Sequence, residues 1–281
     1  MTKNTLPETQ ADWNSHARAS ASQRWRQQSA AMGRKVTEAI VLEAAVQPGE
    51  TVLDVACGTG EPAISLASLV GESGSVTGID ISTEPLKTAN ERAIVRGLKN
   101  TRFFQADVHN LPFPDATFDC ITSRLGVMFF ADLPRALGEL HRVLKPGGRM
   151  AILAWGPMKQ PYFETMIGTL LQTIPGAEVP VAACAMFKFG DPQVLGEAAS
   201  KAGFVDVKAR LASVPWNWPG TAAELWSYFQ DVTVPFRALI EKIPEERRSE
   251  IDAAVCKAIE RYKRYDAIEF TAQVTIVSAR K

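Results

Sequence analysis

Two glycines separated by one residue stand where a short apolar segment meets a region with helical spacing. Gly58 and Gly60 follow the apolar run 51–56, and Asp54 lies inside that run. Glycines at such a junction let the backbone approach a ligand closely, and the N-terminus of the following helix offers N–H groups that have no partner within the helix. The segment therefore predicts a loop that binds a polar ligand through its backbone.

Asp54 helps to decide which ligand this loop takes. The residues from Gly58 to Ala63 also fit GxGxxA, a dinucleotide-binding pattern that is weak when it stands alone. A carboxylate at position 54 would repel a pyrophosphate, whereas it would attract an ammonium or sulfonium group. S-adenosylmethionine carries both of these cations, and its carboxylate can accept hydrogen bonds from the N–H groups of the loop. This chemistry favours S-adenosylmethionine over a dinucleotide.

Two further aspartates stand at the ends of the next two apolar runs. Asp80 comes 20 residues after Gly60 and is placed to accept hydrogen bonds from both hydroxyls of a ribose. Asp107 could accept a hydrogen bond from the adenine amino group, with the backbone of Val108 beside it. Acids at the carboxyl ends of three successive strands would face one crevice, where α/β sheets bind their ligands. The pattern predicts a nucleoside site.

The elements that must position these acids alternate regularly between strand and helix. The strict alternation predicts right-handed βαβ crossovers and a mostly parallel, doubly wound α/β sheet that is covered on both faces. Near-continuous apolar strands agree with burial on both faces. Strands are predicted at 51–56, 75–80, 101–107, 118–124 and 149–155, and helices at 33–46, 61–69, 84–96 and 133–144.

The pattern changes after Trp155. The segment 156–190 reads as irregular, and it is followed by a helix over 191–202 and a strand over 204–214. Two or three helices are predicted within 221–265, and an alternating strand closes the chain. All 6 Trp and all 4 Tyr lie outside residues 26–154. We therefore predict a lid from residues 10–30, 156–190 and 216–265, which forms an apolar pocket for the second substrate.

Four segments together resemble the class I (Rossmann-like) S-adenosylmethionine-dependent methyltransferases. They read VLDVACGTG, GIDIS, ADVHNLPFPDATFDCITS and HRVLKPGG, and they are most similar to the branch that holds the ubiquinone/menaquinone-biosynthesis C-methyltransferases. The resemblance covers residues 34–155 firmly. It implies a seven-stranded sheet with an antiparallel last strand near 269–280. It also implies that the chain is a methyltransferase, and the predicted apolar pocket indicates a small, apolar or aromatic acceptor.

The resemblance assigns residues to each part of the cofactor. The loop from Asp54 to Gly60 would hold the methionine part, and an aromatic residue near the N-terminus would close over the cofactor. The complete set of expected cofactor-binding residues is Asp54, Ala56, Gly58, Thr59 and Gly60 for the methionine part, Asp80 and Ile81 for the ribose, Asp107 and Val108 for the adenine, Ser123 and Arg124 for backbone near the methionine end, and Trp25 for the closing aromatic.

The expected division of the chain follows from the same reading. Residues 1–33 are predicted to form an N-terminal helical cap, and residues 34–281 a methyltransferase domain. Within that domain we expect a cofactor-binding core at 34–155 and substrate-cover segments at 156–190 and 216–265.

No residue stands out as the catalytic one. Methyl transfer from a sulfonium is an in-line displacement, for which alignment and exclusion of water supply most of the acceleration. A base is needed where the acceptor must lose a proton, and His16 and Tyr162 are the weak candidates in the expected lid. His141 is expected to be structural, and His109 to lie nearer the adenine than the methyl group.

Composition narrows the classes of protein and partner. Lys+Arg and Asp+Glu both number 31, so the chain lacks the positive charge that is typical of nucleic-acid binders. The four cysteines show no metal-ligand spacing, so no metal is expected. No apolar signal segment and no apolar run of membrane-spanning length is found, which favours a cytoplasmic protein. The expected partner is a small-molecule methyl acceptor, and the sequence leaves its identity and the oligomeric state open.

Two other functions remain as alternatives. An NAD(P)-dependent oxidoreductase would use a similar glycine loop, but Asp54 and the absence of a Tyr-x-x-x-Lys pattern argue against it. A non-catalytic cofactor-binding protein of the same fold would explain why no base can be named. Methylation of exocyclic amines on nucleic acids is disfavoured, because the residues from Ser123 to Gly126 do not form the D/N-P-P-Y/F motif of those enzymes.

Overall fold

The computed structural model describes residues 20, 21 and 23–281, and the chain divides into two compact units. The first, here called the sheet unit, consists of residues 37–156, 189–212 and 274–281. The second, here called the aromatic unit, consists of the described residues up to Val36 together with 157–188 and 213–273. None of the described helices is both long and apolar enough to cross a membrane.

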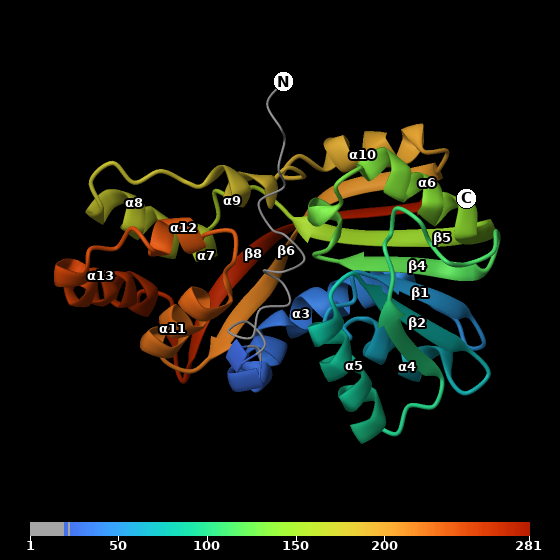
Figure 1. Cartoon of the computed structure of the whole chain (residues 1–281), viewed down its shortest axis with the longest axis horizontal. Helices are drawn as coiled ribbons and strands as arrows, with labels where there is room; N and C mark the ends of the chain where they lie inside the picture. Colours follow the sequence, from blue (N-terminus) through green and yellow to red (C-terminus); the bar gives the residue numbers. More distant parts are fainter. Residues whose placement is uncertain (1–19, 22) are drawn as a thin grey trace. The chain divides into compact units, whose positions relative to one another are not determined.

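The sheet has the order β3-β2-β1-β4-β5-β8-β6, and a two-residue strand, β7, pairs with β8 in addition (Figure 1). Strands β1 to β5 pair in parallel, whereas β8 runs antiparallel to β5, with Leu153 opposite Ile276. The mostly parallel sheet and its antiparallel last strand confirm the predicted fold class. The strands are β1 Thr51–Val55, β2 Ser75–Asp80, β3 Thr101–Gln105, β4 Phe118–Arg124, β5 Leu144–Trp155, β6 Val205–Pro219, β7 Lys263–Arg264 and β8 Ala267–Arg280.

The helices of the sheet unit follow the strands in alternation. Helix α4 packs on β1 and β2, α5 packs on β2 and β3, and α6 lies beside α10 (Figure 1). Helices α6 and α10 begin at capping aspartates, since Asp132 accepts a hydrogen bond from the Arg135 N–H and Asp191 accepts one from the Gln193 N–H. The helices are α4 Ala63–Val70, α5 Thr83–Val95, α6 Leu133–Val143 and α10 Pro192–Lys201, with a short 3₁₀ turn η1 Val127–Phe129; α3 Arg26–Ala44 runs from one unit into the other.

The aromatic unit is built on stacked and edge-on aromatic rings. Tyr162 is 4% exposed and meets the rings of Phe163, Trp216, Phe229 and Phe270 at centroid distances of 5.0, 5.9, 6.0 and 5.6 Å. Such rings bury a large apolar area per residue, which explains how short helices form a stable core. The helices of this unit are α7 Pro161–Phe163, the π-helix η2 Glu164–Gly168, α8 Thr169–Thr173, α9 Val181–Ala185, α11 Ala222–Val232, α12 Arg237–Ile240, η3 Glu245–Arg247 and α13 Arg248–Glu260.

The structure corrects several predicted boundaries. The third strand ends at Gln105, so Asp107 lies in the loop after β3 and not on the strand. The fifth strand begins at Leu144, because the Lys-Pro-Gly-Gly segment joins the strand instead of ending a helix outside it. The segment 156–190, predicted to be irregular, contains short helices, and α3 begins at Arg26 and not near Gly33. Glycine and proline residues indicate where the chain changes direction, but pairing with a neighbouring strand can extend a strand past them.

Candidate functional site

The loop between β1 and α4 adopts an unusual backbone conformation. Ala56, Gly58 and Gly60 have positive φ angles of 55°, 52° and 102°. A Cβ added at Gly60 would lie 2.7 Å from Ile64 Cδ1, so the absence of a side chain there lets the loop pack against α4. A Cβ added at Gly58 would meet no atom of the described residues within 4 Å, so none of these residues covers the backbone at this position. The loop therefore combines a tightly packed side with an open one.

The N–H groups of this loop are partly satisfied within the protein. The Gly58 N–H donates to Asp80 Oδ2 at 2.9 Å, and the Gly60 N–H donates to the Cys57 carbonyl at 2.8 Å. No described residue accepts a hydrogen bond from the N–H of Thr59 or of Glu61. Because α4 follows directly, these two donors lie close to the positive end of its dipole. The loop can therefore hold an anionic group such as a carboxylate.

Asp54 is completely buried beneath the loop. Its carboxylate accepts hydrogen bonds from Thr122 Oγ1 at 2.8 Å and from the Ala63 N–H at 3.2 Å. Burial raises the pKa of Asp54 from its usual 3.8 to about 7, although both hydrogen bonds and the charge of Arg124 lower it. In the structure this side chain joins β1 to β4 and to the start of α4. Its attraction for a bound cation stays a prediction.

Asp80 connects the loop to the end of β2. While Oδ2 accepts from Gly58, Oδ1 accepts from the Ser82 N–H at 2.9 Å. The next residue, Ile81, is an apolar side chain that is 46% exposed, and its carbonyl accepts from Gln105 Nε2 at 2.8 Å. An acid and an exposed apolar side chain thus stand together beside the open side of the loop. An acid of this kind can accept hydrogen bonds from hydroxyl groups, and an apolar side chain can pack against a flat ring.

Asp107 is held by the histidine two residues later. Oδ1 lies 2.9 Å from the His109 N–H and 2.6 Å from His109 Nδ1. His109 Nε2 accepts a hydrogen bond from the Asp132 N–H at 3.1 Å, which leaves Nδ1 as the nitrogen that donates to Asp107. Partial burial raises the pKa of Asp107, but the hydrogen bonds from His109 outweigh it and hold that pKa below its usual range. Asp107 is thus an ionised, half-exposed acceptor, and Val108 beside it is buried.

Arg142 orders the loop that follows Asp107. Its guanidinium donates to the carbonyls of Leu111 and Phe113 at 3.1 and 2.8 Å, and it pairs with Asp115 and Glu139. These partners raise the pKa of Arg142 above its usual range. Arg142 belongs to the HRVLKPGG segment that carries the family resemblance. Its contacts with the carbonyls of the loop after Asp107 do not follow from the sequence.

The end of β4 passes close to the glycine loop. Arg124 Nε donates to the Glu61 carbonyl at 3.3 Å. Ser123 is fully buried, and its hydroxyl has no hydrogen-bond partner among the described residues. A Cβ added at Gly126 would lie 2.5 Å from the Cβ of Ala56, so this turn approaches the loop as closely as a glycine allows. Both residues predicted for the methionine end therefore adjoin the loop.

The other predicted residues belong to the aromatic unit or lie outside the described residues. Trp25 belongs to the aromatic unit, where Nε1 donates to Asp231 Oδ2 at 2.7 Å and the ring meets those of Trp218 and Tyr228. Tyr162 belongs to the same unit, and burial raises the pKa of its phenol well above the usual value, which disfavours its use as a base. His16 lies outside the described residues. The roles predicted for these residues stay predictions.

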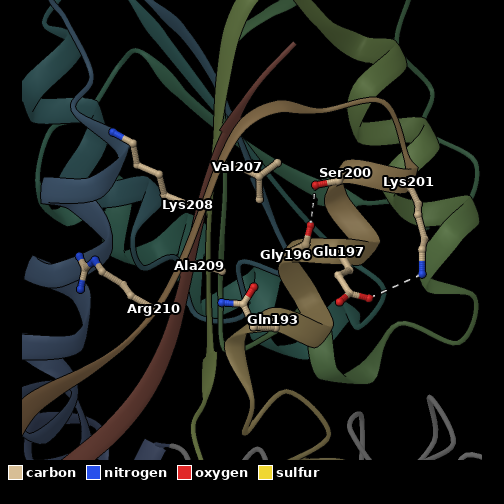
Figure 2. Close-up of a pocket in the computed structure, with 9 residues that line it drawn as sticks. All are labelled: Gln193, Gly196, Glu197, Ser200, Lys201, Val207, Lys208, Ala209 and Arg210. Atoms are coloured by element: carbon tan, nitrogen blue, oxygen red, sulfur yellow. Dashed lines mark hydrogen bonds and ion pairs between the residues drawn. The ribbon is translucent and has the colours of Figure 1, made fainter.

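A separate groove lies at the edge of the sheet, between α10 and β6. Figure 2 shows Val207 on the side of β6 that faces α10, with Lys208 and Arg210 extending to the other side. Two of the cations near it are paired, since Lys201 lies 3.7 Å from Glu197 and Arg210 lies 2.8 Å from Glu43. In the strand order β6 is separated from β1 by β4, β5 and β8, so the groove is distinct from the glycine loop.

Comparison with known proteins places this geometry in a family. Residues 29–174 match the model of the ubiE/COQ5 methyltransferase family. A ubiquinone/menaquinone biosynthesis C-methyltransferase of Teredinibacter turnerae is 42% identical over 120 residues, which are 42% of this chain and 48% of that protein. A 2-phytyl-1,4-naphtoquinone methyltransferase of a Nostoc species is 41% identical over 129 residues, which are 46% of this chain and 56% of that protein.

Solved structures show the same fold. A SAM-dependent methyltransferase from Aquifex aeolicus has a TM-score of 0.52 at 25% identity, over 69% of this chain and 92% of that one. A phosphoethanolamine N-methyltransferase from Haemonchus contortus has a TM-score of 0.58 at 18% identity, over 98% of this chain and 60% of that one. The chain spans about half the length of the curated relatives it matches. The family match extends over more than half of the chain and includes the glycine loop and all three aspartates. The chain therefore belongs to the ubiE/COQ5 methyltransferase family.

Proposed function

We propose that this chain transfers a methyl group from S-adenosylmethionine to a small, apolar or aromatic acceptor. The observation that carries the proposal is the hydrogen bond between the Gly58 N–H and Asp80 Oδ2 at 2.9 Å. This hydrogen bond connects two parts of the site. One is the loop, whose N–H groups can donate to an anion, and the other is Asp80, which can accept hydrogen bonds from ribose hydroxyls. A ligand that carries a carboxylate at one end and a nucleoside at the other fits both groups.

The residues fit the parts of this cofactor in order. The N–H groups of Thr59 and Glu61, which have no acceptor among the described residues, would hold the carboxylate. Asp80 would accept hydrogen bonds from the ribose hydroxyls. Ile81 would cover one face of the adenine, and Asp107 would accept its amino group. The hydroxyl of Ser123, which has no hydrogen-bond partner in the described part of the chain, lies beside the same loop. When bound, S-adenosylmethionine supplies an electrophilic methyl group on a sulfonium.

The contribution of the protein is alignment. The loop is fixed through Asp54, Asp80 and Arg124, so a bound ligand finds its donors already oriented. Where the acceptor must lose a proton, a base is also required. Of the two predicted candidates we propose His16, because burial raises the pKa of the Tyr162 phenol and disfavours it as a base. We place the cofactor-binding core at 34–155 and the acceptor cover at 156–190 and 216–265, with Trp25 as the residue that closes over the cofactor.

Two observations support an apolar acceptor. The rings that pack around Tyr162 make the aromatic unit rich in apolar and aromatic side chains. The names of two relatives specify ubiquinone, menaquinone or a phytyl naphthoquinone. The balanced charge of the chain argues against nucleic acid as the acceptor.

The experiment is a transfer assay with methyl-labelled S-adenosylmethionine. A panel of reduced naphthoquinones and benzoquinones is compared with small amines and with tRNA, and organic-extractable label is counted. The proposal predicts a labelled product from a quinol. The label should be lost in Asp80→Ala and retained in Glu197→Ala, which lies at the separate groove. Label transferred to tRNA instead, or no transfer to any small acceptor by protein that binds the cofactor, would contradict it.

A further inference from the structure

Helix α5 contacts the glycine loop through Arg92. Arg92 Nη1 donates to the Thr59 carbonyl at 2.5 Å, and Nη2 lies 2.8 Å from Glu61 Oε1. The side chains of Arg92 and Glu61 are 17% and 16% exposed, so this contact is largely removed from water. A guanidinium that is held by two acceptors is fixed in position and in orientation. The two acceptors stand on either side of Gly60.

The peptide between Thr59 and Gly60 is thereby held at both of its polar atoms. Its carbonyl accepts from Arg92, and its N–H donates to the Cys57 carbonyl at 2.8 Å. Because a peptide unit is planar, fixing both atoms fixes the plane. The neighbouring peptides carry the N–H groups of Thr59 and Glu61, whose directions depend on this plane. These are the two donors that have no partner among the described residues.

Arg96, one turn further along the chain, makes a natural comparison. Arg96 Nη1 lies 3.3 Å from the same oxygen, Glu61 Oε1, and its side chain is 50% exposed. Its hydrogen bond to Glu61 engages a side chain and no backbone atom of the loop. Arg92 and Arg96 therefore bring the same charge to the same region, but Arg92 also holds the loop backbone.

We propose that Arg92 is a positioning residue, which holds the glycine loop so that the N–H groups of Thr59 and Glu61 face the amino-acid end of the adenosyl cofactor. The inference rests on the proposed function. Arg92 acts through the loop and not by contact with the reacting atoms. The required property is the forked guanidinium and not the positive charge alone, since a lysine cannot reach both acceptors with one planar group.

The test compares two ligands by calorimetry. S-adenosylhomocysteine carries the amino-acid end, whereas 5′-methylthioadenosine lacks it and keeps the nucleoside. We expect Arg92→Lys and Arg92→Gln to weaken binding of S-adenosylhomocysteine by about tenfold or more, as expected for loss of charge-assisted hydrogen bonds. Binding of 5′-methylthioadenosine is expected to change by less than about threefold, and Arg96→Gln to affect neither ligand by more than that.

Each other outcome overturns the inference in a recognisable way. If Arg92→Lys binds S-adenosylhomocysteine as tightly as the unchanged protein does, a positive charge at position 92 is sufficient and the forked guanidinium is not required. If both ligands weaken equally in the Arg92 variants, the residue supports the fold in general and does not position the loop. If the unchanged protein binds neither adenosyl ligand, the proposed function fails and this inference fails with it. If the unchanged protein binds and the variants bind equally well, this inference alone fails.

Discussion

Three aspartates of the sheet unit have the same side chain but different surroundings. Asp54 is buried and bonded to Thr122, Asp80 is shared between the loop and Ser82, and Asp107 is half exposed and held by His109. Burial raises the pKa of Asp54, whereas hydrogen bonds lower that of Asp107. The first therefore stabilises the loop, while the third stays ionised and accessible. Single substitutions can distinguish the stabilising role of Asp54 from the proposed ligand-binding role of Asp107.

Thr122→Val tests the stabilising task of Asp54. Valine has nearly the same shape, but it leaves the buried carboxylate without the hydroxyl that lies 2.8 Å away. We expect the free energy of unfolding to fall by about 1–3 kcal/mol in urea titration. Thr117→Val is the control, because its hydroxyl bonds the Pro114 carbonyl at an exposed site. Equal stabilities of the two variants would contradict the assigned role.

The pH dependence of stability is a second test of Asp54. Its pKa is about 7 in the folded protein against a usual 3.8, so between these values the folded state binds a proton that the unfolded state has lost. This group therefore makes stability fall as pH rises from about 4 to about 7. Asp54→Asn removes the effect, and we expect the destabilisation that it causes to be smaller at pH 8 than at pH 5. Unfolding titrations at both pH values measure it, and a larger destabilisation at pH 8 would contradict the raised pKa.

Asp107→Ala tests the proposed adenine contact. The variant loses a hydrogen bond to a charged acceptor, so we expect its affinity for S-adenosylhomocysteine, measured by calorimetry, to fall by about tenfold or more. Asp115→Ala is the matched control, because Asp115 is 77% exposed and bonds to Arg142. A loss of affinity in both variants would point to general loosening of the loop, and no loss in Asp107→Ala would remove this residue from the site.

At the scale of elements, the glycine loop depends on the turn that follows β4. A Cβ at Gly126 would lie 2.5 Å from the Cβ of Ala56, so Gly126→Ala must displace the loop. We expect a loss of stability of about 1–3 kcal/mol, together with weaker cofactor binding. Gly138→Ala, inside α6, meets no atom within 4 Å and should be neutral or stabilising by up to about 1 kcal/mol. Thermal unfolding of both variants makes the comparison, and an unaffected Gly126→Ala protein would contradict the close approach.

The order of elements could be predicted from sequence because it depends on local patterns. Strand 118–124 and the strand at 75–80 agree with the prediction to the residue. Strand β3 ends two residues before its predicted end, because propensity does not show where pairing with β2 stops. The two-residue strand β7 gives no periodic signal at all. Local spacing therefore predicts elements better than their ends.

The contacts that organise the site were harder to predict. The glycines and the three aspartates show in the sequence because their types and spacing are characteristic. Thr122 and Arg92 do not, since their partners lie 68 and 33 residues away along the chain. A threonine in a strand and an arginine in a helix have many ordinary roles. Their importance becomes visible once the fold brings Asp54 and Thr59 beside them.

At the scale of the whole molecule, the two units differ in chemistry. The sheet unit carries the polar groups that suit a nucleoside with a charged end, and the aromatic unit carries all four tyrosines. Proteins of one fold can act on different substrates, so the fold indicates less about the acceptor than about the proposed cofactor. A test of the central claim should therefore address the cofactor before the acceptor.

The most direct measurement is a calorimetric titration of the full chain with S-adenosylhomocysteine, S-adenosylmethionine and NADH. We predict saturable binding of both adenosyl ligands to one site, no binding of NADH, and loss of adenosyl binding in Asp80→Ala, because Asp80 joins the loop to the ribose position. Binding of NADH in place of the adenosyl ligands would contradict the account and would support an oxidoreductase.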